Sequence, residues 1–131
     1  MKVKKITDKH VLCIGEVLWD VLGYQRKPGG APMNVALHLS RLHIPTHMVS
    51  RVGRDMHGED LLRFLSGEGL STDHIQVDPE LPTSEVLVTL DEKSNATYEI
   101  LEPVAWDHLG YSPELEKIAA DVMEEKGVEF A

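Results

Sequence analysis

The sequence predicts an α/β protein in which helices cover a parallel sheet. Residues 11–14 form a short, continuous apolar run, which is typical of a strand buried on both faces. Two further strands are predicted at 46–53 and 74–77, and amphipathic helical patterns at 32–42 and 56–65 separate the three strands. Because strands and helices alternate along the chain, the pattern favours parallel strands with covering helices.

Proline, glycine and acidic residues mark the ends of the two helices. Pro32 suits the first turn of the first helix, and Pro45 prevents that helix from continuing. Gly67 is predicted to end the second helix. Glu59 and Asp60 lie in its first turn, where carboxylates complement the helix dipole. We therefore interpret these two acids as helix stabilisers and not as an acid/base pair.

A hairpin and a third helix are predicted in the second half. Residues 83–90 and 96–101 alternate around the polar turn 91–95, which indicates two antiparallel strands. Apolar groups on both faces of 83–90 predict that this strand is covered on each side. After a Ser112 cap, one apolar helical face follows, and residues 128–131 resemble the start of another strand. The members of that face are Leu115, Ile118, Ala119, Val122 and Met123, and Gly127 is predicted to end the helix.

Composition excludes several classes of partner. The 131 residues have 42% hydrophobic and 27% charged content, as expected for one globular domain. A net charge of −9 leaves no surplus of cations for nucleic acid or an anionic membrane. The single cysteine, Cys13, lies in a predicted strand and permits no internal disulfide, which suits a reducing cytoplasm. The sequence shows no signal peptide and no apolar run of membrane-spanning length.

The stretch 28–36, Pro-Gly-Gly-Ala-Pro-Met-Asn-Val-Ala, is the first candidate for a binding site. Gly29 and Gly30 allow positive φ and let another molecule approach the backbone closely. Asn34 falls in the first helical turn, where its amide can both donate and accept hydrogen bonds, as a neutral polyol requires. The alternative is a tight loop that starts a helix, with Asn34 satisfying only nearby backbone groups.

Asp20 is the second candidate. It lies at the end of an extended stretch just before the glycines, and its carboxylate could accept hydrogen bonds from two sugar hydroxyls. The alternative is a solvent-facing aspartate at the end of a strand.

These motifs together resemble the ribokinase-like (phosphofructokinase B) carbohydrate kinases. The residues that carry the resemblance are Gly29, Gly30, Asn34, Ala36 and the spaced Gly53, with Gly15-Glu16 and Trp19-Asp20 upstream. The sequence of the glycine stretch is most similar to that of the fructokinase branch. His43 departs from the family pattern, which usually has Gly or Ser just past the helix; histidine adopts the left-handed conformation less readily than glycine.

The resemblance implies a three-layer fold with a small β lid over the sugar, present here only in its N-terminal part. Residues 1–131 would form part of one domain, with lid segments at approximately 16–30 and 83–102. Asp20 would be the sugar-orienting acid, with Gly29, Gly30 and Asn34 beside it. Tyr98 or Ile100 would point at the sugar, and the equal alternative is that both belong to the core of the lid. Family lids often pair face to face, so a homodimer through the lid or an exposed sheet edge is expected.

The family transfers the ATP γ-phosphoryl group to a sugar hydroxyl with Mg²⁺, using a base in a Gly-x-Gly-Asp motif. This chain lacks that motif, since Gly67-Glu68-Gly69 is followed by Leu70. We therefore expect no catalytic base and no nucleotide site in the 131 residues, weak binding of ATP and Mg²⁺, and no kinase activity of the chain alone. His43 and His47 are separated by Pro45, so we expect no metal site there.

Two other functions were weighed. A non-catalytic module that binds a sugar or self-associates through the lid is the alternative to a kinase fragment. Dinucleotide binding is disfavoured because only one glycine, Gly15, follows the first strand. The identity of the sugar stays open, since fructose, ribose or another polyol suits the same polar groups.

Overall fold

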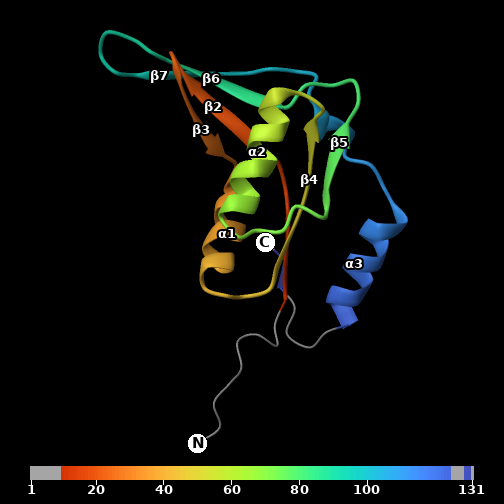
Figure 1. Ribbon diagram of the computed structural model, residues 1–131. Helices are drawn as coiled ribbons and strands as arrows, with labels where there is room; N and C mark the ends of the chain where they lie inside the picture. Colours follow the sequence, from red (N-terminus) through yellow and green to blue (C-terminus); the bar gives the residue numbers. More distant parts are fainter. Residues whose placement is uncertain (1–9, 125–128, 131) are drawn as a thin grey trace, which may run out of the picture.

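The computed structural model describes residues 10–124 and 129–130, which form two four-stranded sheets and three α-helices (Figure 1). In chain order the elements are β1 (Val11–Ile14), β2 (Leu18–Leu22), β3 (Gln25–Gly29), α1 (Ala31–Arg41), β4 (Thr46–Gly53), α2 (Met56–Gly67), β5 (Ile75–Asp78), β6 (Ser84–Leu90), β7 (Ala96–Ile100), the 3₁₀ helix η2 (Ala105–His108), α3 (Pro113–Glu124) and β8 (Glu129–Phe130).

The first sheet has the order β5-β4-β1-β8, and all its strand pairs are parallel, as predicted. We call it the parallel sheet. Strand β1 pairs with β4 from Val11 opposite Thr46 to Ile14 opposite Val49. The predicted strands at 11–14, 46–53 and 74–77 are therefore confirmed, the last one shifted by one residue.

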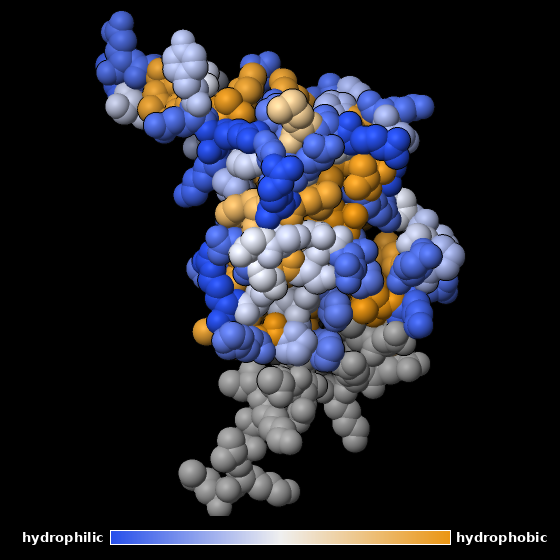
Figure 2. Space-filling model, viewed as in Figure 1, coloured by the Kyte–Doolittle hydropathy of each residue, from blue (hydrophilic) through white to orange (hydrophobic). Residues whose placement is uncertain are grey.

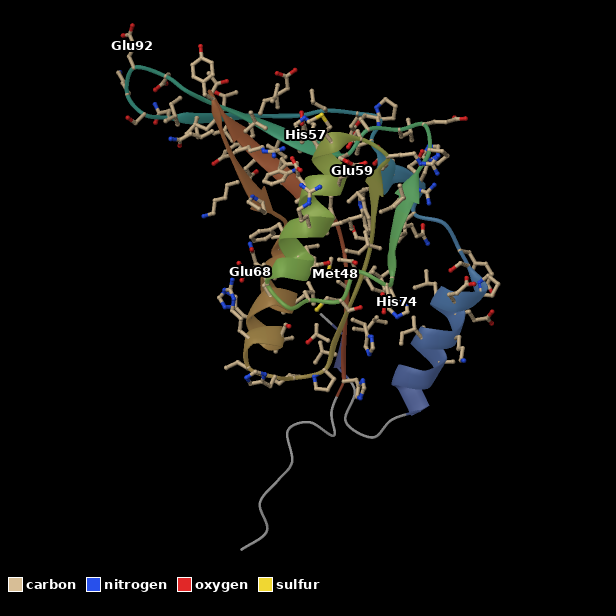
Figure 3. The ribbon with its side chains drawn as sticks, viewed as in Figure 1. Met48, His57, Glu59, Glu68, His74 and Glu92 are labelled. Carbon is tan, nitrogen blue, oxygen red and sulfur yellow. The ribbon has the colours of Figure 1, made fainter. Side chains whose placement is uncertain are left out.

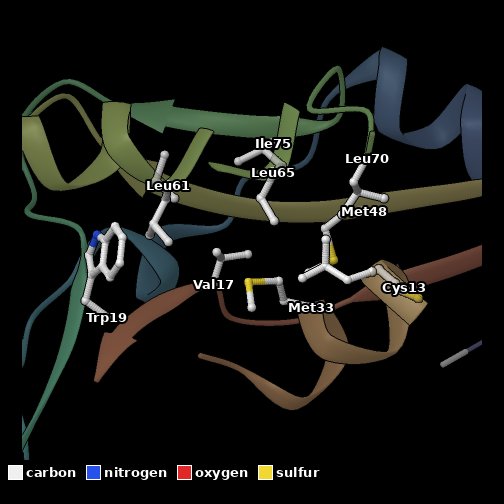
Figure 4. Close-up of a cluster of buried hydrophobic side chains, with 12 residues drawn as sticks. Cys13, Val17, Trp19, Met33, Met48, Leu61, Leu65, Leu70 and Ile75 are labelled. Carbon is white, nitrogen blue, oxygen red and sulfur yellow. The ribbon is translucent and has the colours of Figure 1, made fainter. Parts of the chain in front are cut away.

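Helices cover both faces of the parallel sheet, because successive strand residues point to opposite sides. Cys13 and Met48 are buried against α1 and α2, whereas Leu12 and Val49 pack against α3. Figure 4 shows the larger cluster, in which helix residues Met33, Leu61 and Leu65 meet the strands. Burial raises the pKa of the Cys13 thiol, as expected for an unreactive core cysteine. The result is three layers, as the sequence predicted.

The second sheet has the order β3-β2-β6-β7, and we call it the small sheet. Strand β2 is antiparallel to β3 and parallel to β6, and β6 and β7 form the predicted hairpin. Strand β3 was not predicted as a separate strand; its residues fall within the expected lid segment 16–30. Pro28 is tolerated in β3 because this strand lies at the edge of the sheet.

The small sheet has two different faces. Its inner face carries Trp19, Arg26 and Glu85, all of which contact α2. Its open face carries the alternate residues, and those used below are Asp20, Leu22, Val86, Val88, Leu90, Tyr98 and Ile100. Among the described residues the predicted cover on both sides of β6 is found on the inner face only, since Leu90 on the open face is exposed. Figure 2 shows apolar surface at the upper left, over these strands.

The helix ends follow local sequence, with one correction. Gly30 caps α1 with φ 115°, and His43 adopts φ 60° just past its end, so both positions take left-handed conformations. Gly67 was predicted to end helix α2, but the helix continues through it. The helix ends where Gly69 reaches φ 85° and the Leu70 N–H donates to the Leu65 carbonyl.

Helix α3 begins as predicted, with the Leu115 N–H donating to the Ser112 hydroxyl at 3.0 Å. Leu115, Ile118 and Ala119 pack against the parallel sheet. The side chains of the other two predicted members of this face, and Gly127, lie outside the described residues. No helix in the described part of the chain is both long and apolar enough to cross a membrane.

Candidate functional site

Two segments that are separate in the sequence meet at the start of α1. A Cβ atom at Gly15 would collide with the Pro32 ring, and one at Gly30 would collide with the Glu16 carbonyl. The connection between β1 and β2 therefore lies directly against the first turn of α1. Glycine is required at Gly30 for two reasons, its positive φ and this close backbone approach.

Asp20 lies beside this corner. Its carboxylate occupies the space where a side chain at Gly29 would stand, and Leu18 lies 2.9 Å from the same position. Glycine at position 29 thus leaves room for the carboxylate. Asp20 is half-buried, and no described residue donates a hydrogen bond to its side chain. The carboxylate is therefore available to accept hydrogen bonds from a bound molecule.

A hollow of about 370 Å³ lies on the open face next to Asp20. Tyr98 contributes from β7 and Val88 from β6, so the hollow brings together two of the predicted site residues, Asp20 and Tyr98. The residues that line it are Asp20, Leu22, Gln25, Arg26, Lys27, Val88 and Tyr98. The Asp20 carboxylate, the cationic Lys27 and the Tyr98 ring surround a space large enough for a small polar ligand, whereas the guanidinium of Arg26 lies on the inner face.

The remaining predicted residues do not line this hollow. The Asn34 N–H donates to the Gly30 carbonyl at 3.0 Å, and its side chain is exposed and has no hydrogen-bond partner among the described residues. Ile100 is 64% exposed on the open face, and Tyr98 is 65% exposed. Neither is buried within this chain. The structure thus groups Asp20 with Gly29 and with Tyr98, and does not bring Gly30, Asn34 or Ile100 into the hollow.

Sequence reasoning missed a polar network on the inner face of the small sheet. Arg26 of β3 contacts three groups: the His57 ring at 2.9 Å, the Asp60 carboxylate, and the Trp19 ring, whose centroid lies 4.1 Å from the guanidinium carbon. Glu85 of β6 lies 3.0 Å from the other ring nitrogen of His57. No motif signals these contacts, because the partners come from three elements far apart in the sequence.

A second missed feature joins the two sheets at the start of β6. The Asp55 carboxylate caps α2 by accepting from the Gly58 N–H at 2.8 Å, and accepts from the Thr83 N–H at 3.0 Å and hydroxyl at 2.7 Å. Although burial raises it, these hydrogen bonds from Thr83 and Gly58 hold the pKa of the Asp55 carboxyl below its ordinary value. A Cβ at Gly53 would lie 2.6 Å from the Thr83 nitrogen, so the spaced glycine is needed for this junction.

A second hollow, of about 390 Å³, lies between β5 and the start of α3. Arg51 lines this hollow, and its guanidinium group donates hydrogen bonds to Asp78 at 2.9 Å and to Gln76 at 3.0 Å. Gln76 in turn holds both backbone groups of Gly110. Arg51 and Gln76 are thus engaged in holding the chain together, unlike Asp20.

Histidines also gather near the N-terminal ends of the strands of the parallel sheet. The His10 and His47 rings stack with centroids 5.5 Å apart, and His74 meets His47 edge-on at 5.7 Å. His43, in contrast, lies past the end of α1. In the part of the chain that the structure describes, no group of three or more His, Cys, Asp or Glu side chains is arranged to hold a metal ion.

Comparison with known proteins gives these features a family. The sequence profile described as pfkB family carbohydrate kinase matches residues 1–120. The chain belongs to this family. The fructokinase of Vibrio alginolyticus is 39% identical over 71 residues, which cover 54% of this chain and 23% of that relative. The matched range includes the stretches around Asp20, Gly29 and Asn34.

Solved structures of the pfkB family share the fold. The fructokinase of Xylella fastidiosa with bound ATP superposes with a TM-score of 0.71 and 32% identity, covering 79% of this chain and 33% of that one. An uncharacterised sugar kinase from Pyrococcus horikoshii superposes with a TM-score of 0.73 and 31% identity, covering 93% of this chain and 42% of that one. The chain spans 23% to 39% of the length of three curated relatives.

Proposed function

We propose that this chain carries the sugar-facing part of a fructokinase-type carbohydrate kinase, whose reaction transfers the ATP γ-phosphoryl group to a sugar hydroxyl. The observation that supports this most is the Asp20 carboxylate, which lies against Gly29 with no protein donor among the described residues. A carboxylate can accept from two adjacent hydroxyls at once, which is the pattern a sugar presents.

The other predicted residues have complementary roles in this proposal. The bare backbone of Gly29 and Gly30 lets the sugar approach the corner, and the Asn34 amide donates and accepts at its far side. The small sheet acts as the lid, made of segments near 16–30 and 83–102. Tyr98 and Ile100 extend the open face over the sugar. Residues 1–131 form the N-terminal part of one such domain in a cytoplasmic enzyme.

The reacting groups for phosphoryl transfer are not assigned to this chain. The sequence lacks Gly-x-Gly-Asp, and the described residues form no cluster suited to a metal ion. That these residues bind ATP and Mg²⁺ poorly stays a prediction, and we derive no chemical step through either. We propose that the chain alone does not transfer phosphoryl groups. A longer reading frame that carries Gly-x-Gly-Asp downstream would distinguish a kinase from a binding module.

Calorimetry with fructose tests the proposal. Asp20→Asn removes the charge and keeps the shape, so it should raise the fructose Kd about ten- to a hundredfold, because a hydrogen bond to a charged group contributes about 1.5–3 kcal/mol. Asp73→Asn makes the same chemical change at an exposed residue of the connection between α2 and β5, and should leave Kd unchanged. Equal affinities for Asp20→Asn and the parent would remove Asp20 from the site.

The open face also favours a second function, self-association. Leu22, Leu90, Tyr98 and Ile100 are exposed together on it, and a patch of this kind marks a contact with another molecule. We propose a homodimer through the open faces of two small sheets, with an exposed sheet edge as the alternative. Sedimentation tests this: Ile100→Lys should dissociate the dimer, whereas Val35→Lys on α1 should not. A chain that sediments as a monomer throughout would contradict it.

A further inference from the structure

The contact between the small sheet and α2 offers more than packing. Figure 3 shows His57 at the upper end of α2, next to the strands of the small sheet. We use the name clasp for Trp19, Arg26, His57, Asp60 and Glu85, which come from β2, β3, α2 and β6. All five meet on the inner face, directly behind the open face that carries Asp20.

The geometry fixes which ring nitrogen of His57 carries a proton. A guanidinium group only donates, so the His57 Nδ1 atom, 2.9 Å from Arg26, must accept. The Nε2 atom then carries the hydrogen and donates to the Glu85 carboxylate at 3.0 Å. A neutral imidazole satisfies both partners. If Nδ1 were protonated, two hydrogen-bond donors, the His57 imidazolium and the Arg26 guanidinium, would face each other, and both would carry a positive charge.

Arg26 holds the clasp together. Its guanidinium pairs with Asp60, donates to His57, and covers the Trp19 ring. The Trp19 ring is 6% exposed and donates from its indole nitrogen to the His57 carbonyl at 2.9 Å. In Figure 4 Trp19 lies at one end of the buried cluster. Loss of the Arg26 contacts would therefore uncover one face of this ring.

The clasp controls the position of Asp20 through two strands. Trp19 precedes Asp20 on β2 and points to the opposite face, and Lys27, which pairs with Asp20 across the ladder, follows Arg26 on β3. Gly29 ends the same strand. Clasping Trp19 and Arg26 onto α2 thus holds the carboxylate and the glycine corner in one arrangement.

We propose that Arg26 and His57 are positioning residues that hold the sugar-facing strands on α2, and that protonation of His57 releases them. The part that concerns the sugar rests on the proposed function; the clasp itself does not. The charged groups that face His57 are Arg26 on β3, Glu85 on β6, Asp60 on α2 and Asp55, which caps α2. The carboxylates keep attracting the imidazolium, so the ring stays on α2 while Arg26 moves away.

Tryptophan fluorescence without sugar tests the clasp. The chain has two tryptophans, so Trp106→Phe leaves Trp19 as the reporter. Between pH 8 and pH 5, the range in which histidines change charge, acrylamide quenching of Trp19 should rise at least twofold. In Arg26→Gln, the quenching of Trp19 should equal at both pH values the quenching that the parent shows at pH 5. His57→Gln keeps a hydrogen-bond acceptor and a donor but cannot take up a proton. At both pH values, its Trp19 quenching should equal the quenching of the parent at pH 8.

The controls decide whether the change belongs to the clasp. His38→Gln, an exposed histidine on α1, should keep the full transition, and circular dichroism should show the same fold at both pH values. No change in the parent between pH 8 and pH 5 would overturn the proposal. An unaltered transition in His57→Gln would overturn it as well, because another histidine would then be responsible.

Fructose binding at pH 8 tests the positioning role separately. Arg26→Gln should raise Kd about fivefold, and Arg41→Gln, whose partner is Glu68 just past the C-terminal end of α2, should not. If Asp20→Asn weakens binding and Arg26→Gln does not, the positioning role is wrong. If the parent binds no fructose, the proposed function fails, and the quenching result alone decides the clasp.

Discussion

The two sheets of this chain are built in opposite ways. The parallel sheet is covered on both faces, and its central residues, such as Leu12 and Met48, are fully buried. The small sheet is covered on its inner face, while its open face leaves Tyr98 and Ile100 exposed beside Asp20. Stability is thus concentrated in one region, and groups available for binding in the other. Substitutions should therefore separate stability from binding.

Truncation of matched apolar side chains should give the largest contrast. Leu61→Ala leaves a cavity among fully buried side chains and should lower the free energy of unfolding by about 2–5 kcal/mol. Ile100→Ala on the open face should change it by no more than about 0.5 kcal/mol. Urea denaturation measures both values. Equal losses would show that the small sheet is as tightly packed as the parallel sheet.

Two glycines allow a second comparison of stability, because Gly30 lies in a tightly packed corner and Gly67 lies in a helix with open space around it. Gly30→Ala would place a side chain at φ 115° against the Glu16 carbonyl, so the unfolding free energy should fall by about 1–3 kcal/mol or more. Gly67→Ala, at a helical site with open space around it, should raise it by up to about 1 kcal/mol. Thermal denaturation compares them, and a neutral Gly30→Ala would contradict the close packing described here.

Acid should weaken the contacts of Asp78, which holds the start of the connection from β5 to β6. N–H groups of Leu81 and Glu80, then Arg51, donate to its carboxylate and lower its pKa from 3.8 to about 2. Because the folded pKa is the lower one, the stabilisation is complete above about pH 4 and is lost as the pH falls toward 2. Denaturation at pH 7, 4 and 2 should therefore show a steeper loss for the parent than for Asp78→Asn. Parallel curves would contradict this.

The surface ion pair between α1 and the end of α2 should have the smallest effect. Arg41 and Glu68 lie 3.0 Å apart but are 50% and 37% exposed. Arg41→Ala should therefore change the unfolding free energy by about 0.2–1 kcal/mol, and added salt should reduce the difference. A larger loss in urea denaturation would mean that this exposed contact, and not the buried core, holds the helices together.

Much of the parallel sheet could be predicted from local sequence. Strand β4 has the predicted bounds, because Pro45 precedes it, a glycine ends it, and Met48, Val49 and Val52 supply its buried apolar residues. Strand β3 could not be predicted, since its sequence, Gln-Arg-Lys-Pro-Gly, has low strand propensity. Pairing with β2 at the sheet edge forms it, which is a tertiary effect.

The candidate site was predicted in part. Asp20 and the glycines were identified from residue types and family resemblance, and the structure places the carboxylate beside Gly29. Sugar binding by these residues stays a prediction. The clasp had no sequence signal, because Arg26 and His57 lie 31 residues apart and belong to no motif. Contacts of this kind depend on how two elements meet, which periodicity does not encode.

Hydrogen exchange with and without saturating fructose tests the central claim most directly. If the open face binds the sugar through Asp20, fructose should slow exchange in peptides that contain residues 18–22, 25–34 and 96–100, and leave residues 46–53 of the parallel sheet unchanged. Asp20→Asn should abolish this protection. Protection confined to the parallel sheet, or equal protection in Asp20→Asn, would contradict the account.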